Sequence, residues 1–377
     1  MIRKAVISGL LIFPILTSIL TAQVERTSNW NVRSLAMGGA GVALRSNENP
    51  LFHNPAILNF VKKRKVTLID FRVRFNQQLY NDYTFFKDNQ DRFENVNDMS
   101  ESEQNAFFID ILNEAQKPAN LSINGPLQIQ FIAPGWGVAL VTEGSGDAEV
   151  FAGATGLPIA DIQFHGETLF IGGYANSLVN LLPNPLHLGI NIKSMTRWTS
   201  HKIKTITGLS DDETLDIYKG QTFSLDFGAL YSINRNVSVG MTFYDINSPK
   251  FSWENVDGDR GIQPSGKALD ASMKMGVAYV PGWRNAGIFE NIVFAADVNH
   301  PFNSDITFFK KLFLGAEASL PPFFHIGTGF YQGYTSFGIG IDIRWLRLDF
   351  ALYGEELGKY AGDVVSWNKA FSAQIGF

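Results

Sequence analysis

The feature that most constrains this sequence is a two-residue alternation of apolar and polar side chains, which recurs from Val66 to the C-terminus. Successive side chains of a β-strand point to opposite faces, so this period predicts strands with one apolar and one polar face. In the first such segment, one face carries Thr67, Ile69, Phe71, Val73 and Phe75, and the other carries Asp70, Arg72 and Arg74. An apolar outer face and a polar inner face are typical of strands in a membrane barrel.

The alternation predicts about fourteen strands, allowing for one or two more near 148–154. After the first, the main candidates are 121–133, 136–143, 160–175, 186–199, 223–231, 237–243, 271–280, 290–299, 311–320, 323–331, 334–344, 346–353 and 367–377. Tight turns fall at Pro321-Pro322 and Gln332-Gly333, and long loops at 76–120, 200–221, 246–270 and 354–366. Short turns on one side and long loops on the other favour an all-β fold, a transmembrane antiparallel β-barrel.

The N-terminal segment predicts export. Arg3 and Lys4 precede an apolar run from Ala5 to Leu20, and Thr21-Ala22 offers a small residue for cleavage, so residues 1–22 are expected to be a signal peptide. The alternative is a membrane anchor, but the run is shorter than the ~20 residues that a spanning helix needs. Later in the chain no window reaches ~18 uninterrupted apolar residues. The exported chain is then either a soluble β-sandwich or a barrel in the cell outer membrane.

Composition narrows the class further. Charged residues make up 18% of the chain, whereas about 25% is usual, and the chain contains 31 Phe and 35 Gly. The net charge of −5 gives no indication of nucleic-acid binding. Cysteine is absent, which removes disulfides, thiolate metal sites and a cysteine nucleophile.

The last strand supports the barrel over the sandwich. Its alternation continues to a terminal aromatic residue, Phe377. This ending resembles the C-terminal signature of outer-membrane barrels, which the barrel-assembly machinery recognises. The resemblance implies that Phe377 is an assembly signal and that the partners include this machinery and outer-membrane lipid.

Residues 24–62 lack the alternation and contain two small-residue motifs. Gly38-Gly39-Ala40-Gly41 has almost no side-chain volume, which suits backbone that lies against another surface, although a flexible loop is the alternative. Asn54-Pro55-Ala56 is a turn signal. Its role is either to hold a compact segment or to act as a movable gate. The expected organisation is a hatch at 23–62 inside a barrel formed by 63–377.

These motifs resemble the hatch of FadL-type long-chain fatty acid transporters and their PorV- and TraF-like relatives. That family has a small-residue run and, about a dozen residues later, an Asn-Pro-Ala. The resemblance implies a fourteen-stranded plugged barrel that passes hydrophobic small molecules, typically long-chain fatty acids, by passive diffusion. The plug or gate residues carried over are Met37, Gly38, Gly39, Gly41, Asn54, Pro55 and Ala56. PorV-like relatives imply the alternative of a partner in protein secretion, and the C-terminal segment resembles barrels of spirochaetes.

No sequence motif predicts a catalytic, cofactor-binding or metal-binding site. The glycine run follows no strand, which argues against a dinucleotide fingerprint, and the six histidines form neither H-x-x-H nor H-E-x-x-H. We therefore expect no enzyme, cofactor or metal. Asp211-Asp212-Glu213 and Asp257-Gly258-Asp259 are expected to be solvated loop clusters, and the latter lacks EF-hand spacing.

Two further sets of residues have open roles. Asp70, Arg72, Arg74, Asp226 and Asp342 are expected to face the lumen, where they either pair with one another or, for Arg72 and Arg74, contact a carboxylate cargo. The segment from Ser100 to Gln116 predicts an amphipathic helix capped by Ser100 or Ser102. That helix is either a surface element or a lid at the pore mouth.

Overall fold

The computed structural model describes residues 31–115, 117–125, 128–154, 156–179, 182–205, 216–256, 264, 269–283, 285–358 and 360–376. The expected signal peptide, the two acidic loop clusters and Phe377 lie outside these residues.

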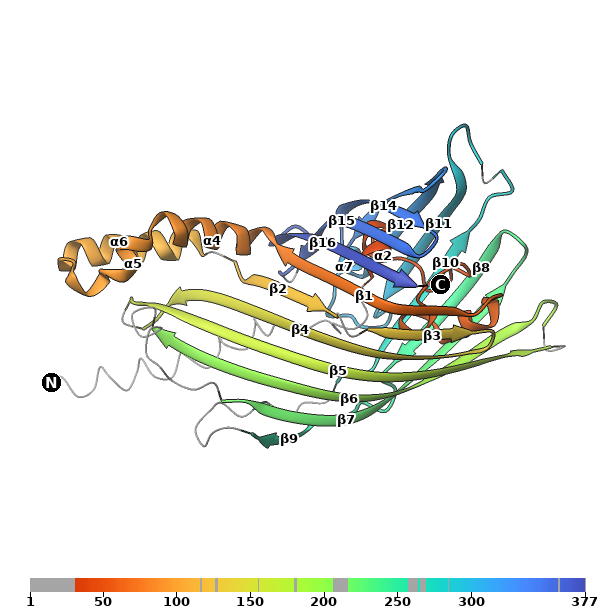
Figure 1. Ribbon diagram of the computed structural model, residues 1–377, viewed down its shortest axis with the longest axis horizontal. Coiled ribbons are helices and arrows are strands. Elements are labelled where there is room, and N and C mark those ends of the chain that lie inside the picture. Colours follow the sequence, from red (N-terminus) through yellow and green to blue (C-terminus); the bar gives the residue numbers. More distant parts are fainter. Residues whose placement is uncertain are drawn as a thin grey trace.

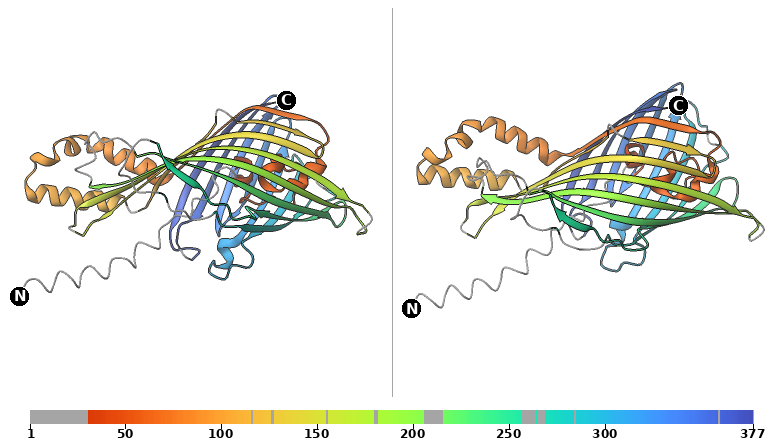
Figure 2. Two further views of the ribbon diagram at one scale, coloured as in Figure 1. Left: turned by 90° about the horizontal axis from the view of Figure 1, so that it is seen from below. Right: turned by 60° about the horizontal axis from the view of Figure 1, so that its bottom comes forward.

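The described strands form one antiparallel sheet that closes on itself, because the last strand, β16, pairs with the first, β1. Figure 2 shows the resulting barrel. In chain order the strands are β1 (Lys65–Asn76), β2 (Ala119–Asn124), β3 (Ile129–Ala133), β4 (Trp136–Ala152), β5 (Pro158–Leu178), β6 (Leu186–Thr205), β7 (Tyr218–Ser232), β8 (Val237–Tyr244), β9 (Ser252–Asn255), β10 (Ser272–Tyr279), β11 (Glu290–Asn299), β12 (Leu312–Leu320), β13 (Phe324–Tyr331), β14 (Tyr334–Ile343), β15 (Leu346–Glu356) and β16 (Val365–Gly376).

These strands occupy fourteen positions around the barrel. β2 and β3 share one position between β1 and β4, and β8 and β9 share one position beside β7. The fourteen-stranded barrel is therefore confirmed. One predicted strand, 121–133, is in fact two, because the ladder breaks between Asn124 and Ile129. The loop 246–270 contains a short strand, β9, that the sequence did not predict.

The expected alternation holds along most of β1. Asp70, Arg72 and Arg74 are buried inside, whereas Phe71 is exposed on the outer face. Thr67 was assigned to the wrong face. A bulge between Thr67 and Ile69 shifts the register, so Thr67 is buried inside. One extra residue in a strand reverses the facing of every position before it.

Side chains on the outer face are large and apolar on all sides of the barrel. Exposed members include Ile69, Phe71, Ile123, Phe170, Ile190, Phe223, Val277, Phe337, Leu348 and Phe371. A soluble sandwich would turn polar side chains outward at these positions, so the outer face is the one that meets lipid.

The two ends of the barrel differ. One end, which we call the short-turn end, contains the tight connections at 134–135, 233–236, 321–323 and 344–345. The opposite, long-loop end contains most of the extended connections, but also the two-residue turn at Gln332-Gly333, which was expected among the short turns, and the connection 280–289 lies at the short-turn end. The separation of turns from loops is therefore strong but not complete.

A helical projection extends from the long-loop end, as Figure 1 shows in orange. It consists of α4 (Gln77–Asp88), α5 (Gln90–Glu94), η3 (Val96–Asp98) and α6 (Glu101–Glu114), and a further short helix, α7 (Phe308–Lys311), precedes β12. The predicted helix from Ser100 is confirmed as α6. Its capping box pairs the Ser100 side chain with the Glu103 backbone, and the Glu103 side chain with the Ser100 backbone. No helix within the described residues is long and apolar enough to cross a membrane.

Candidate functional site: a plugged lumen

Residues 31–61 lie inside the barrel, where Figure 2 shows them in red. They form α2 (Val32–Ala36), α3 (Pro50–His53) and the 3₁₀ helix η2 (Pro55–Phe60), which together we call the plug. The Asn31 and Asn54 side chains cap α2 and η2, and a proline stands in the first turn of both α3 and η2. These local signals explain why short helices form in a segment that has no strand pattern.

The glycine run lets the plug backbone reach the barrel wall. Gly38, Gly39 and Gly41 have φ of 62°, 73° and 151°, a region that other residues rarely adopt. The carboxylate of Asp297, on β11, accepts hydrogen bonds from the backbone N–H groups of Gly41 (2.7 Å) and Val42 (3.0 Å). Asp297 is fully buried, so these charge-assisted bonds anchor the plug to the wall.

The wall is shaped to receive the plug. At eight inward-facing glycines, a Cβ atom would lie within 3.0 Å of a plug atom, closer than real Cβ atoms approach. We call this ring the glycine belt; it consists of Gly173, Gly189, Gly228, Gly240, Gly276, Gly315, Gly329 and Gly338. Within strands, glycine marks close approach of another backbone, which here is the plug.

The Asn54-Pro55-Ala56 turn is held on three sides. The Asn54 amide donates to the carbonyls of Val42 (2.9 Å) and Ala229 (3.1 Å), and its oxygen accepts from the Ala56 N–H (3.0 Å). The carbonyl of the preceding residue, His53, accepts from the Tyr244 hydroxyl at 2.6 Å. Burial lowers the pKa of His53 to about 3, so its imidazole adds no charge to the plug. The motif acts as a turn in this structure, and its second suggested role, as a gate, stays a prediction.

Arg72 lies at the edge of the break between β2 and β3, opposite Asn124, and Arg74 lies two residues further along β1, opposite Ser122. Residues 65–67 of β1 pair with β3 and residues 72–75 pair with β2, which interrupts the described ladder over 68–71. Behind this break, the Asp70 carboxylate accepts from Arg72 Nε (2.9 Å), Gln128 Nε2 (2.9 Å) and Gln374 Nε2 (2.6 Å). Arg72 is 2% exposed, so its charge is matched by Asp70 within the wall. A cargo role for Arg72 and Arg74 stays a prediction.

One part of the lumen is apolar, contrary to the expected polar interior. Buried apolar side chains of β3 to β6 face inward and meet plug residues Leu51, Phe52 and Leu58. We call these wall residues the apolar strip; they are Ile132, Ala139, Val141, Leu169, Ile171, Ala175 and Met195. Because Val138, Leu140 and Phe170 on the other face are apolar too, these strands are apolar on both faces. Phe251 and Trp253 close the strip at its long-loop end.

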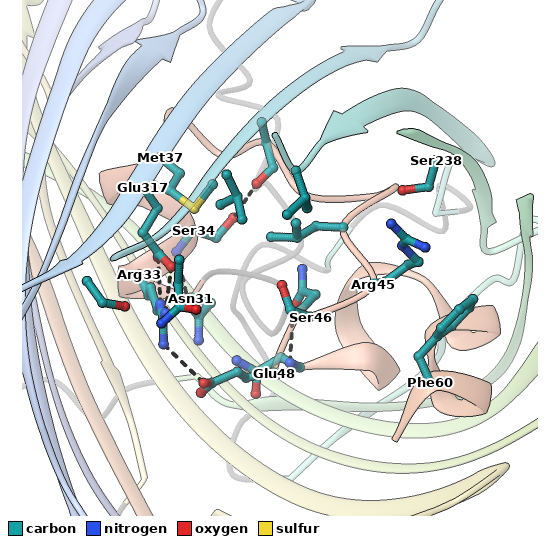
Figure 3. Close-up of a pocket in the computed structure, with 18 of the residues that line it drawn as sticks. Asn31, Arg33, Ser34, Met37, Arg45, Ser46, Glu48, Phe60, Ser238 and Glu317 are labelled. Carbon is teal, nitrogen blue, oxygen red and sulfur yellow. Dashed lines mark hydrogen bonds and ion pairs between the residues drawn. The ribbon is translucent and has the colours of Figure 1, made fainter. Parts of the chain in front are cut away.

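A cavity of about 640 Å³ opens between the plug and the wall at the short-turn end (Figure 3). On one side Arg33 pairs with Glu317 on β12 (2.5 Å) and with Glu48 (3.0 Å), and Glu48 also accepts from Arg347 (2.9 Å). On the other side lie Arg45 and Phe60. The plug thus separates a charged cavity at this end from the apolar strip.

The predicted plug residues all lie at the contact between plug and wall, in two groups. Met37, Gly38, Gly39 and Gly41 face β10 to β13, and Asn54, Pro55 and Ala56 face β6 and β7. Asp226 faces the lumen as predicted and pairs with Lys193 (2.6 Å), whereas Asp342 lies at the exposed rim beside Arg347. Sequence reasoning missed Asp297, the glycine belt and the apolar strip. The only signal for the belt was glycine at inward positions of alternating strands.

A closed antiparallel barrel with an apolar outer face and an N-terminal plug in its lumen is a plugged transmembrane barrel. Residues 51–288 match the model of the protein family described as "F plasmid transfer operon, TraF, protein". The chain therefore belongs to that family. The TraF-like resemblance is thereby confirmed. No curated protein matches the chain.

Solved structures agree with the fold. A "TodX monoaromatic hydrocarbon channel deltaS2 mutant" shares 11% identity with a TM-score of 0.53, covering 93% of this chain and 98% of that one. A "TodX deltaS2S3 mutant monoaromatic hydrocarbon channel" shares 13% identity with a TM-score of 0.51, covering 92% and 98%. The Pseudomonas putida toluene transporter TodX shares 11% identity over 92% of this chain and 97% of that one, with a TM-score of 0.49. The two TM-scores above 0.5 show that this chain shares the barrel fold of those structures.

Proposed function

We propose that this protein is an outer-membrane channel through which hydrophobic small molecules diffuse passively. The observation that carries the proposal is the apolar strip. A barrel that conducts hydrophilic solutes has a polar lumen, whereas here seven buried apolar wall residues lead from Phe251 to the plug. The solved structures of similar fold that are described as monoaromatic hydrocarbon channels support the same class of cargo.

In the proposed route, cargo enters at the long-loop end, which in membrane barrels is the outer side. It then moves along the strip to the plug at Leu51, Phe52 and Leu58. The glycine belt holds the plug against the wall around most of the barrel, so a straight path would require many contacts to break. The break between β2 and β3 offers a sideways exit into the membrane instead. This mechanism makes and breaks no bond in the cargo, so the protein is not an enzyme in this proposal.

Long-chain fatty acids are the proposed cargo, with monoaromatic hydrocarbons as the competing class. The test is uptake of labelled oleate and labelled toluene by cells that lack their own hydrophobic channels, with the amount of inserted barrel measured in the same cells. Faster oleate uptake than in cells without the protein supports the fatty-acid proposal. Faster uptake of toluene alone would reassign the cargo, and faster uptake of neither would refute the channel.

A variant pair links uptake to the strip. Leu169 is 2% exposed and lies on the strip wall. Leu169→Asn places an amide there, at a cost of about 1–3 kcal/mol, which predicts a fall in uptake of at least about fivefold. Leu169→Met keeps the wall apolar and is expected to retain uptake. Equal rates for the two variants would exclude the strip from the route.

A second candidate function is a partner role in protein secretion, which the helical projection favours. Its α4 exposes Tyr80, Tyr83 and Phe86, and α6 exposes Ile109, a concentration of apolar side chains typical of interaction surfaces. Under this alternative, replacing these four residues by serine impairs secretion and leaves uptake of small molecules unchanged. The opposite pattern supports the channel.

A further inference from the structure

The long-loop end of the apolar strip is closed by a cluster that the channel proposal does not yet use. Leu169 pairs in register with Met195, and the next inward pair toward the loops is Glu167 with Arg197. The wall therefore changes there from apolar to charged. Phe251, immediately before β9, packs on the strip and is only 7% exposed.

Arg197 joins the charged pair to the aromatic residues. Its guanidinium bonds to Glu167 at 2.9 Å and 2.5 Å and lies over the Phe251 ring, 4.8 Å from the centroid. A guanidinium over an aromatic face is attractive, and an ion pair with a carboxylate fixes its position. Phe251 is thus held in place by a side chain of the barrel wall.

Trp253 completes the cluster. Its ring lies 5.2 Å from that of Phe251, and it stands opposite Gly220, where a Cβ atom would lie 2.6 Å from the indole. The indole Nε1–H is buried and has no hydrogen-bond partner within the described part of the chain. A buried donor without a partner costs about 1–3 kcal/mol, and a bound molecule with an acceptor removes that cost.

The attachments of this segment are fewer than those of the plug. Residues 245–247 are tied to β7 by several bonds: the Asn247 amide donates to the Phe223 carbonyl at 2.9 Å, the Ile246 N–H donates to the Leu225 carbonyl at 2.9 Å, and the Asp245 carboxylate accepts from Ser224. Next to Phe251 itself, the Lys250 carbonyl accepts from Thr222 at 2.8 Å. The plug, in contrast, meets eight strands at the glycine belt. Opening at Phe251 therefore breaks fewer contacts than moving the plug.

We propose that Phe251, Trp253 and Arg197 form an entrance filter over the apolar strip, and that the filter selects apolar molecules that carry one hydrogen-bond acceptor. Phe251 excludes polar solutes from the strip, and Trp253 Nε1–H donates to the acceptor of the cargo as it enters. This inference rests on the proposed channel function.

The test compares two probes of similar size, ring-labelled acetophenone, which carries a carbonyl acceptor, and ring-labelled ethylbenzene, which carries none. Initial uptake is measured in cells that lack their own hydrophobic channels, with inserted barrel quantified. Trp253→Phe keeps an aromatic ring but removes the donor. One hydrogen bond is worth about 1 kcal/mol, so the ratio of acetophenone to ethylbenzene uptake is expected to fall about fivefold. Phe251→Ala is expected to raise uptake of both probes.

Matched controls lie on the outer face: Trp367→Phe and Phe170→Ala alter exposed residues and are expected to change neither rate. If the unaltered protein takes up oleate but neither probe, the filter is wrong and the channel stands, whereas failure to take up oleate as well refutes both. If it takes up both probes, but Trp253→Phe leaves the ratio unchanged or Phe251→Ala does not raise uptake, the filter alone is wrong.

Discussion

The packing of the plug against the glycine belt makes one prediction with a magnitude. Gly240, on β8, faces the plug, and a Cβ atom there would lie 2.6 Å from the Val42 carbonyl oxygen and 2.8 Å from Ala43 Cα. Both are backbone atoms, which cannot rotate away. Gly240→Ala therefore moves this part of the plug by about 1 Å to restore ordinary contact distances.

That movement breaks two hydrogen bonds of Val42. Its carbonyl accepts from Asn54 at 2.9 Å, and its N–H donates to Asp297 at 3.0 Å. A neutral bond contributes about 1 kcal/mol, a bond to a charged group about 2 kcal/mol, and overpacking adds at least about 1 kcal/mol. The docked plug is expected to lose about 4 kcal/mol, which shifts the docking equilibrium by nearly a thousandfold.

Two assays measure the loss. Hydrogen exchange of the amides of residues 41–43 reports opening of the plug, and conductance of single barrels in planar bilayers reports whether the lumen becomes accessible to ions. Faster exchange and larger or more frequent conductance are expected for Gly240→Ala. The control is Gly172→Ala, at a strand position where an added Cβ has nothing within 4 Å. Equal behaviour of the two variants would show that the plug does not lie against Gly240.

Three further predictions concern single side chains. Asp297→Ala removes the hydrogen bonds that the carboxylate accepts from Gly41 and Val42, whereas Asp297→Asn keeps one acceptor oxygen. Hydrogen exchange of the plug amides is therefore expected to be faster in Asp297→Ala than in Asp297→Asn. Asp70→Ala removes the carboxylate that forms an ion pair with the buried Arg72, and thermal unfolding is expected to show a loss of about 3–5 kcal/mol, whereas an unchanged Tm would contradict the ion pair. Hydrogen bonds from Ser100 lower the pKa of Glu103, so the contact stabilises α6 above the ordinary glutamate pKa and is lost as pH falls through the lowered value. Ser100→Ala is expected to raise the Glu103 pKa toward its ordinary value in an NMR titration.

The sequence predicted the barrel because strand facing is a local property. Alternation in β7 or β16 follows from the two-residue period alone, and it placed Phe371 outside and Asn368 inside. The start of α6 was also predictable from the sequence, because its capping residues Ser100 and Glu103 lie on one helical turn. The bulge near Thr67 and the break between β2 and β3 were not predictable from the sequence, because only the pairing with neighbouring strands shows a change of register.

The contacts of the plugged lumen were less predictable from the sequence than the strands, because they depend on tertiary structure. The motifs at Gly38 and Asn54 indicated a plug, but their partners Asp297 and Gly228 lie far along the chain, and no local pattern connects them. Arg72 was identifiable as an inward charge, while its ion pair with Asp70 depended on the geometry of one strand face. The sequence by itself determined the apolar outer face of most strands and that a small-residue segment precedes the barrel. Closure of the sheet decided the rest, because it brings strands from the two ends of the chain around one lumen and sets which side chains meet there.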